Sequence, residues 1–431
     1  MYLIYSALIA LILVVGSPYW FFQMLRHGKY RRGLRERFGS VPQRMRLSMP
    51  SIWVHAVSVG EVLAVTELVR QLRTEFPNHH VVISTTTDTG QKLAVSKFGA
   101  GSVFYFPLDF VLPIRHWVQA LRPELIVVAE TEFWPNFLRI GKAAGARIAV
   151  VNARISDRSL PGYKRWKRIL RRVLANVDIF LAQTSEDARR LKEIGASQDC
   201  VFVGGNLKYD VLVPARAIIV EQLQAALRQS SVGPVWICGS TVEGEEALLL
   251  DAFKRILESF PRAVMLLAPR HPERFNAVAE LLRQSGVPFS MRSQWDGQTL
   301  AGGSILLIDS IGELASLYAL ADIAFVGGSL VPRGGHNIIE PAQHGVPILI
   351  GPHTDNFRDI VRLFQMNDAV RVVQTDQLVS VLLNLFANEE ERKALGKRAA
   401  DTLRSQQGAT DLAIEKLKGL LPVHAHEAAP A

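Results

Sequence analysis

The chain has 431 residues, of which 48% are hydrophobic and 21% charged, and its formal net charge is +9. This length suggests two or three domains, and the composition is that of an ordinary globular protein, which excludes a disordered chain. The excess positive charge is placed unevenly along the chain, and that placement bears on the partner of the protein.

The chain begins with an uncharged apolar segment. Leu3–Phe22 contains no charged residue and is long enough to cross a bilayer as a helix. It lacks the positive start and the small-residue cleavage site of a signal peptide, and positive charges follow it. We therefore expect residues 1–25 to form a retained membrane anchor helix, with the rest of the protein on the cytoplasmic side. Pro18 and the aromatic cluster Trp20–Phe22 leave open that the helix lies partly in the interface.

Two basic clusters follow the apolar segment. The first comprises Arg26, Lys29, Arg31, Arg32, Arg35 and Arg37. The second comprises Lys164, Arg165, Lys167, Arg168, Arg171 and Arg172, interleaved with Tyr163, Trp166, Ile169 and Leu170. Basic helices that carry aromatic residues suit an anionic membrane surface. Nucleic acid is the competing partner, but the neighbouring apolar segment favours lipid, so we expect no nucleic acid. For the second cluster alone, a solvated face remains an alternative.

Short apolar runs then alternate with amphipathic helical stretches, in two series. The first series is Ile52–Val57, Val81–Thr86, Val103–Phe106, Leu125–Ala129, Arg147–Val151, Ile179–Ala182 and Val201–Val203. The second series is Val235–Cys238, Val264–Ala268, Ile305–Asp309, Ile323–Val326 and Val346–Ile350. This alternation predicts an α/β fold with parallel sheets wound with helices.

We therefore expect two Rossmann-like domains facing a central cleft, preceded by the anchor helix. The expected segments are 1–25 (anchor helix), 26–50 (basic juxtamembrane link), 51–212 (first domain), 213–233 (linker), 234–421 (second domain) and 422–431 (disordered tail).

Polar residues collect where the predicted strands end, which is where working residues lie in open α/β sheets. Ser58 and Glu61 follow the first strand with the S-x-x-E spacing of a capping box. Glu61 is therefore either a helix cap or a carboxylate that accepts a proton from a substrate hydroxyl, once burial raises its pKa.

The strand Leu125–Ala129 runs into two acidic residues, Glu130 and Glu132. Carboxylates at such a position are costly to bury without partners, so at least one of them is expected to meet a cation or a sugar hydroxyl. Lys208, which follows the strand Val201–Val203, is a candidate partner, although it is also explained as a surface lysine.

In the second half, Ile323–Val326 runs into a glycine-rich loop that contains Gly327, Gly328, Gly334 and Gly335. A short helix is expected next, with Asn337 as its N-cap and Glu340 as the capping-box partner. Such a loop presents unpaired N–H groups and a positive helix end to an anion, most often a phosphate. Alternatively, these glycines only make turns.

Two further strand ends in this half carry charged residues. Arg270 follows Val264–Ala268, and its guanidinium fork matches phosphate oxygens. Glu313 follows Ile305–Asp309 as an acidic group without an obvious partner. His271 and His336 have no spacing that requires a metal ion, and we expect no metal site.

These observations predict an anionic nucleotide in the second domain and a hydroxyl-bearing acceptor in the first, which is the arrangement of a glycosyl transfer. A UDP-sugar transferase or a sugar-nucleotide epimerase is an alternative with the same fold. A membrane-tethered protein that binds a nucleotide sugar without reacting is a second alternative, which the acids at the strand ends disfavour.

The chain resembles the 3-deoxy-D-manno-octulosonic acid (Kdo) transferases of lipopolysaccharide synthesis, which are glycosyltransferases of the GT-B type. The resemblance covers nearly the whole chain in the following motifs: HAVSVGE (55–61), TTTDTG (85–90), AETEFWPN (129–136), VNARISDRS (151–159), GNLKYD (205–210), PRHPERF (269–275) and FVGGSLVPRGGHN (325–337). It implies a metal-independent enzyme at the inner membrane that moves Kdo from CMP-Kdo to lipid IVA on the cytoplasmic face, with no cofactor.

The resemblance also implies roles for individual residues. The family's proton acceptor corresponds to Glu61, and its two proposed transition-state-stabilising positions correspond to Glu130 and Lys208. Its CMP contacts correspond to Pro269, Arg270, Ile311, Gly312, Glu313, Asn337, Ile338, Ile339 and Glu340.

The sequence departs from the family pattern at two places. The family often has a proline directly after the asparagine of the last motif, but this chain has Ile338 at that position. In this chain the proline comes later, as Pro341, directly after Glu340. Ile308 likewise stands where a glycine often precedes the aspartate. Side-chain contacts at Asn337 and Glu340 therefore transfer directly, and we expect the residues between them to contribute backbone groups.

Overall fold

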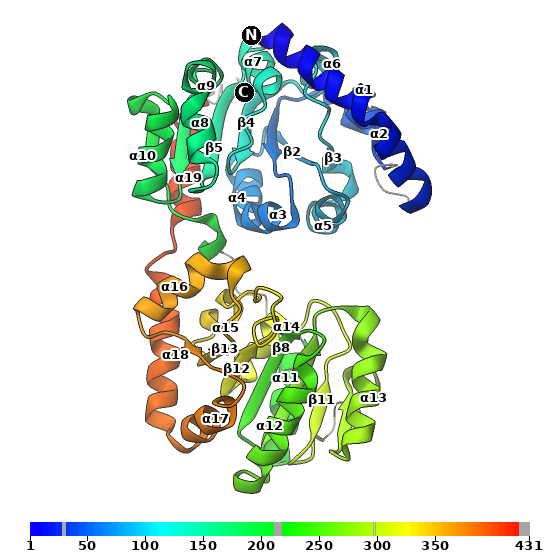
Figure 1. Cartoon of the computed structure of the whole chain (residues 1–431), viewed down its shortest axis with the longest axis vertical. Helices are drawn as coiled ribbons and strands as arrows, with labels where there is room; N and C mark the ends of the chain where they lie inside the picture. Colours follow the sequence, from blue (N-terminus) through cyan, green and yellow to red (C-terminus); the bar gives the residue numbers. More distant parts are fainter. Residues whose placement is uncertain (28–31, 211–217, 296, 298, 422–431) are drawn as a thin grey trace, which may run out of the picture. The chain divides into compact units, whose positions relative to one another are not determined.

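A computed structural model of the chain describes residues 1–27, 32–210, 218–295, 297 and 299–421 (Figure 1). The chain forms two compact units: unit 1 contains Met1–Val211 and Gln406–Ala431, and unit 2 contains Leu212–Ser405. Lys29 and Arg31 of the first basic cluster, residues 213–217 of the predicted linker and the predicted tail 422–431 lie outside the described residues.

Unit 1 is built on a parallel sheet of seven strands in the order β3-β2-β1-β4-β5-β6-β7. These are β1 (Ser51–His55), β2 (His80–Thr85), β3 (Val103–Tyr105), β4 (Pro123–Ala129), β5 (Arg147–Ala153), β6 (Ile179–Ala182) and β7 (Val201–Val203). The chain moves outward from β1 to β3 on one side and from β4 to β7 on the other. A switch point therefore lies between β1 and β4.

Unit 2 has a second parallel sheet of seven strands, in the order β10-β11-β9-β8-β12-β13-β14. These are β8 (Val235–Thr241), β9 (Val264–Pro269), β10 (Phe289–Met291), β11 (Ile305–Leu307), β12 (Ile323–Val326), β13 (Ile348–Ile350) and β14 (Arg371–Val372). Every strand expected from the sequence is present. Two strands, β10 and β14, were not predicted from the sequence; both are short edge strands with partly exposed side chains.

Helices cover both sheets (Figure 1). Unit 1 contains α1 (Tyr2–His27), α2 (Leu34–Arg37), α3 (Val59–Ala64), α4 (Thr66–Glu75), α5 (Asp88–Phe98), α6 (Val111–Leu121), α7 (Pro135–Ala143), α8 (Leu160–Arg165), α9 (Lys167–Leu174), α10 (Ser185–Ile194) and α19 (Ala409–Lys418). Unit 2 contains α11 (Ile218–Gln229), α12 (Glu245–Ser259), α13 (Phe275–Ser285), α14 (Leu314–Leu317), α15 (Ile339–Gln343), α16 (Arg358–Met366), α17 (Leu378–Ala387) and α18 (Glu389–Arg404).

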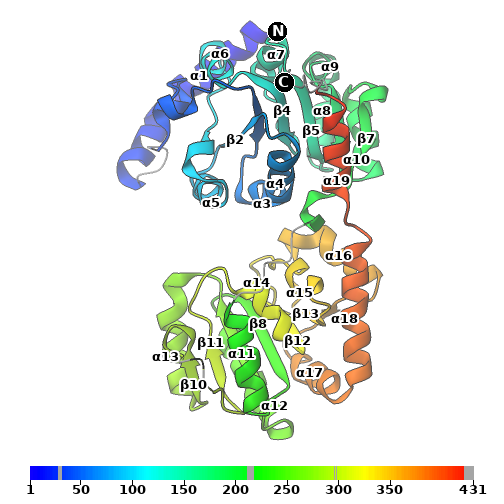
Figure 2. The ribbon, with the colours of Figure 1, turned by 180° about the vertical axis from the view of Figure 1, so that it is seen from behind.

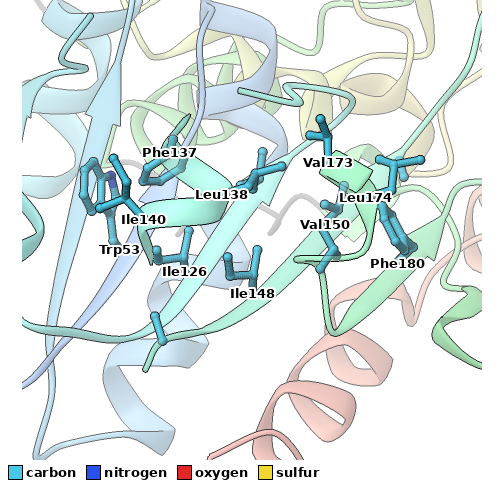
Figure 3. Close-up of a cluster of buried hydrophobic side chains, with 14 of the residues drawn as sticks. Trp53, Ile126, Phe137, Leu138, Ile140, Ile148, Val150, Val173, Leu174 and Phe180 are labelled. Carbon is cyan, nitrogen blue, oxygen red and sulfur yellow. The ribbon is translucent and has the colours of Figure 1, made fainter. Parts of the chain in front are cut away.

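The side chains of the central strands alternate between two apolar cores in unit 1. Ile126 and Val128 of β4 belong to one core, and Leu125 and Val127 belong to the other. Figure 3 shows part of the first core, where side chains of α7 pack over β4 and β5. Because strand side chains point alternately to opposite faces, a strand covered by helices on both sides must be apolar throughout.

The C-terminal segment belongs to unit 1, and this corrects the expectation that residues up to 421 complete the second domain. Ala413, Ile414 and Leu417 of α19 are buried in the second core of unit 1, where α19 packs against α4 (Figure 2, red). The carboxylate of Asp210 accepts hydrogen bonds from the N–H groups of Gly408 (2.8 Å) and Thr410 (2.5 Å).

The second half of the predicted linker is also part of a folded unit. Residues 218–229 form α11, and its side chains Ile219, Val220 and Leu223 are buried in a core of unit 2.

The N-terminal helix α1 is long and apolar enough to cross a membrane, judged by length and composition, over Tyr2–Trp20. No residue of that segment is fully buried inside the protein.

Candidate active site

Glu61 lies where β1 gives way to α3, beside the switch point of the unit 1 sheet. Its carboxylate accepts hydrogen bonds from the N–H of Val57 and from the hydroxyl of Ser58, both at 2.8 Å. The Ser58 hydroxyl is in turn the N-cap of α3. The predicted capping box is therefore confirmed, and it holds the carboxyl group in a fixed position.

The environment of Glu61 changes its acidity. The residue is 7% exposed. The pKa of Glu61 is raised to about 7. Burial is the largest cause and the nearby charges of Glu130 and Glu132 add to it, while the hydrogen bonds from Val57 and Ser58 act in the opposite direction. A carboxyl group with a pKa near neutrality is suited to general base catalysis, because it combines a large ionised fraction with strong proton affinity.

Glu130 and Lys208 approach one another in the same unit. Glu130 follows β4 in a left-handed conformation (φ 57°), so the strand ends before it and it does not share a strand face with Glu132. Its Oε1 lies 3.8 Å from Nζ of Lys208, which confirms the predicted pairing. The segment that carries Lys208, Leu207–Asp210, packs against α3. Glu61, Glu130 and Lys208 therefore lie close together in unit 1 and form one candidate site.

Asn152, at the end of β5, positions the backbone that carries Lys208. It is buried and left-handed (φ 55°), and its Oδ1 accepts a hydrogen bond from the N–H of Leu207 at 3.1 Å. Asn206 adds a second support, because its side chain accepts from the N–H of Lys208 at 3.0 Å. Asn152 was not predicted as a site residue; its place in the VNARISDRS motif was the available signal.

In unit 2, a second polar site lies at the carboxyl ends of β9 and β12. The guanidinium of Arg270 is exposed, and no ion pair or hydrogen bond to it occurs within the part of the chain that is described. It lies close to His336 and Glu340, because its charge acts on the pKa of both. Burial raises the pKa of Glu340, and the charge of Arg270 opposes that rise. Burial is the larger cause for His336, whose pKa falls to about 4, and this imidazole is therefore neutral near pH 7. An arginine without an ion-pair partner among the described residues, beside a neutral imidazole, suits an anionic ligand.

The segment after the glycine-rich loop differs in detail from the expectation. The helix α15 begins at Ile339, and Asn337 lies two residues before it. Asn337 still satisfies the helix start, because its Oδ1 accepts from the N–H of Ile339 at 3.1 Å while its Nδ2 donates to Glu340 at 3.2 Å. The predicted pairing of Asn337 with Glu340 is thus present. The N-cap position itself is occupied by Ile338, and Asn337 lies one residue before it.

The glycine-rich loop itself is not a vacant anion site, which corrects the sequence-based expectation. The buried carboxylate of Glu245 accepts hydrogen bonds from the N–H groups of Gly328 (2.7 Å), Ser329 (2.9 Å) and Leu330 (2.9 Å). It also accepts from the N–H of Val242 at 3.1 Å. The loop does form a nest of N–H groups, but an acid of the chain itself occupies it.

Glycine is required in this loop for reasons of space. A Cβ atom at Gly327 would lie 2.8 Å from a carboxylate oxygen of Glu245 and 2.6 Å from the carbonyl oxygen of Ser240. At Gly328 the backbone is left-handed (φ 72°), and a Cβ would lie 2.8 Å from the His336 ring. The glycines therefore allow the backbone to close over the carboxylate of Glu245.

The remaining predicted contacts lie after β11. Glu313 is not an unpartnered acid as expected, because its carboxylate pairs with Arg292 at 3.1 Å and accepts a hydrogen bond from Ser310. Gly312 is left-handed (φ 92°), and the side chain of Ile311 is 68% exposed. Pro269 is the last residue of β9 and is buried. Among the described residues, no three His, Cys, Asp or Glu side chains are grouped so as to hold a metal ion.

Comparison with known proteins identifies the family. The family model of 3-deoxy-D-manno-octulosonic-acid transferase (kdotransferase) matches residues 32–211. The chain is 35% identical over 398 residues to the 3-deoxy-D-manno-octulosonic acid transferase of Haemophilus influenzae, which covers 91% of this chain and 92% of the relative. The chain belongs to the Kdo transferase family.

The chain is similar to further proteins as well. The Kdo transferase of Bordetella pertussis is 33% identical to this chain, over 93% of this chain and 95% of the relative. The crystal structure of the C-terminal CMP-Kdo binding domain of WaaA from Acinetobacter baumannii is 35% identical in sequence and covers 43% of this chain and 98% of that one, with a TM-score of 0.40.

The fold of this Kdo transferase is also found among enzymes with other activities. The UDP-GlcNAc 2-epimerase of Neisseria meningitidis, solved with UDP-GlcNAc, has a TM-score of 0.55 and covers 86% of this chain and 100% of its own, at 13% identity. This similarity confirms the GT-B-like fold of two parallel α/β sheets. At such low identity it concerns the fold alone, so the activity of the Kdo transferase follows from the family.

Proposed function

We propose that this Kdo transferase moves Kdo from CMP-Kdo to a glucosamine hydroxyl of lipid IVA, with Glu61 as the general base. The observation that carries the proposal is the buried Glu61 carboxyl, whose pKa is raised to about 7 at the edge of the unit 1 sheet. The direct test is mass spectrometry of the lipid formed by the purified protein from CMP-Kdo and lipid IVA. Formation of Kdo-bearing lipid is expected, and its absence with active substrates contradicts the choice of donor or acceptor.

In the proposed reaction, the acceptor oxygen forms a bond to the anomeric C2 of Kdo while the bond from C2 to the phosphate oxygen breaks. The configuration at C2 inverts. The hydroxyl proton passes to Glu61, and CMP leaves with the electron pair of the broken bond. Atoms and charges balance without a further reactant, because the acceptor loses the proton that Glu61 gains and CMP keeps the electron pair of the broken bond. A monophosphate leaving group carries less charge than a diphosphate, so the proposed step requires no metal ion.

The roles of the other site residues in the proposal follow from their charges. Arg270 supplies a cation to the departing phosphate, and Asn337 and Glu340 hold the nucleotide beside it. Backbone groups at Pro269, at Ile311–Glu313 and at Ile338–Ile339 complete the donor contacts. Lys208 stabilises negative charge that develops in the transition state, and Glu130 fixes its ammonium group through the 3.8 Å ion pair.

We further propose that α1 anchors the enzyme to the inner membrane, with both units in the cytoplasm. The basic residues of α8 and α9 then face the anionic lipid surface, where the phosphorylated acceptor lies.

The pH dependence of the reaction provides a test of the base. Because only the carboxylate accepts a proton, turnover at saturating substrates should rise as the pH increases and level off above the Glu61 pKa of about 7. Ser58→Ala removes a hydrogen bond that stabilises the carboxylate, so the inflection should move to higher pH. The measurement is a pH–rate profile of both proteins. A wild-type profile that shows no inflection in the neutral range contradicts the assignment.

The Arg270→Ala change tests the donor site. Loss of a charge-assisted hydrogen bond to phosphate costs about 1.5–3 kcal/mol, so the Kd for CMP should rise about 10- to 150-fold. Isothermal titration calorimetry with CMP measures this change. Arg283→Ala is a matched control, because Arg283 lies on the exposed surface of α13 and pairs with Glu280 on the same helix. Equal affinities for the two variants contradict the proposed role of Arg270.

A further inference from the structure

The first two turns of α1 contact unit 1 through polar side chains. Nδ2 of Asn136 donates a hydrogen bond to the hydroxyl of Ser6 at 3.1 Å. The Tyr5 hydroxyl interacts with the carboxylate of Asp109, which is 3% exposed. The guanidinium carbon of Arg139 lies 4.6 Å from the centre of the Tyr2 ring. The N-terminal end of α1 is therefore fixed to the start of α7.

The segment that follows α1 is fixed to the same unit. In α2, the carboxylate of Glu36 accepts a hydrogen bond from the N–H of Tyr105 at 2.8 Å, and its carbonyl accepts from Trp117 at 2.9 Å. Arg37 donates to the carbonyl of Thr86 at 2.6 Å. A fully extended chain spans at most about 3.6 Å per residue, so the short connection between α1 and α2 covers no more than about 25 Å. The C-terminal end of α1 therefore also lies near unit 1.

These contacts are incompatible with a helix that crosses the bilayer. A spanning α1 places its first turn and its last turn on opposite sides of an apolar layer about 30 Å thick. Unit 1 lies on one side of that layer, yet the first turns of α1 contact Asn136 and Asp109 of unit 1. Both ends of α1 must therefore lie on the side of the membrane that holds unit 1. Figure 1 shows α1 running along unit 1, from α7 past α6 towards α2.

One side of α1 remains apolar and uncovered. The side chains exposed by more than half are Leu3, Ile4, Leu8, Leu11, Ile12, Val14, Val15, Tyr19 and Phe22. The spacing of one helix face is followed by side chains that are partly covered, namely Tyr2, Tyr5, Ser6, Ile9 and Leu13. An apolar row of this length is unfavourable in water and requires a lipid or protein partner.

The neighbouring surface of unit 1 indicates lipid as that partner. The Tyr2 hydroxyl donates to the carbonyl of Arg172 in α9 at 3.5 Å, so α9 adjoins the start of α1. Trp166 (59%) and Ile169 (42%) are exposed there. They lie among the exposed basic residues of the second cluster. Basic helices with exposed aromatic and aliphatic side chains bind anionic membrane interfaces.

We propose that α1 is an interfacial helix, lying in the plane of a single leaflet, with unit 1 covering one side of it and lipid the other. The inference rests on the proposed membrane localisation and specifies its geometry. An ordinary interfacial helix has a polar face of its own. In α1, which is apolar on most of its circumference, the contact with unit 1 takes the place of that face.

This arrangement places the membrane beside the catalytic residues. Asn136 and Arg139, which contact α1, belong to the helix that follows Glu130 and Glu132 directly in the chain. Asp109 likewise lies after the carboxyl end of β3. The first turns of α1 are thus fixed at the sheet edge that carries Glu61 and Glu130, where a lipid-embedded acceptor presents its sugar.

The experiment uses the full chain in native membranes, with Cys200 and Cys238 replaced by serine. In a Ser6→Cys/Asn136→Cys variant, mild oxidation should form a disulfide within the chain, detected by mass spectrometry of a digest. Leu11→Cys/Asn136→Cys is the matched control, because Leu11 is exposed on the opposite side of α1, and it should remain unlinked.

A second measurement reports the side of the membrane. A single cysteine inserted after Met1 should react with a membrane-impermeant maleimide in inside-out vesicles and should stay unlabelled in right-side-out vesicles. Glu390→Cys in unit 2 is the control for the cytoplasmic side and should give the same result. Labelling of the N-terminal cysteine in right-side-out vesicles overturns the inference, and so does the absence of the disulfide. Kdo transfer measured in the same membranes separates the two proposals, because activity with an outward N-terminus leaves the proposed function intact.

Discussion

Glu61→Gln should lower the turnover number for Kdo transfer by about 10²- to 10⁴-fold, while the Kd for CMP stays unchanged. Glutamine has the same length as glutamate, and its amide oxygen can still accept a hydrogen bond from Val57 or Ser58 in place of the carboxylate. It cannot take a proton from the acceptor hydroxyl. The measurements are steady-state rates at saturating CMP-Kdo and lipid IVA, and calorimetric titration with CMP.

The control for this variant is Ser58→Ala, which removes the helix cap and keeps the base. Loss of an N-cap typically costs about 1 kcal/mol of stability, so this protein should be slightly less stable and still active. Equal losses of turnover in the two variants would mean that Glu61 acts only as a cap of α3, and the general base would have to be sought elsewhere.

Glu245→Ala should lower the free energy of unfolding of unit 2 by about 3–5 kcal/mol, as expected when one partner of a buried, hydrogen-bonded charge is removed. The change leaves the N–H groups of Val242, Gly328, Ser329 and Leu330 without an acceptor in a buried position. Each such group retains its desolvation penalty. Because the glycine-rich loop leads to Asn337, the affinity for CMP should fall as well. Urea denaturation followed by a signal from Trp236, which is buried in unit 2, measures the loss.

Glu243→Ala provides the matched comparison for Glu245. It lies two residues earlier and is exposed, so its removal should change the unfolding free energy by less than about 0.5 kcal/mol. If Glu245→Ala is no more destabilising than Glu243→Ala, the buried carboxylate does not hold the loop together.

Much of the fold was predictable because short apolar runs specify buried parallel strands. Runs such as Ile179–Ala182 and Ile323–Val326 coincide with β6 and β12 at both ends. The edge strands β10 and β14 were missed because a strand with one neighbour needs no continuous apolar side chains. The ion pair of Lys208 with Glu130 was predictable because both residues follow strands of one sheet, whose carboxyl ends share an edge.

Other features of the site depend on contacts between distant residues. The sequence predicted a glycine-rich loop that presents N–H groups to an anion, but the acid that accepts from them comes from the start of α12, far earlier in the chain. Spacing alone does not distinguish Glu245 from its neighbours Glu243 and Glu246. The ion pair of Glu313 with Arg292 could not be predicted either, because the two residues lie on opposite sides of β11 in the chain.

The return of the chain to unit 1 has a consequence for its biosynthesis. Unit 2 is continuous in sequence, whereas the core of unit 1 requires Ala413, Ile414 and Leu417 from the last helix. Domains generally fold during synthesis as soon as their residues are available. Unit 2 can therefore mature while the nascent first unit still exposes the apolar surface that α19 will cover. The N-terminal half of this enzyme is thus made first and completed last, and a chain that ends at Ser405 would leave that surface open to aggregation.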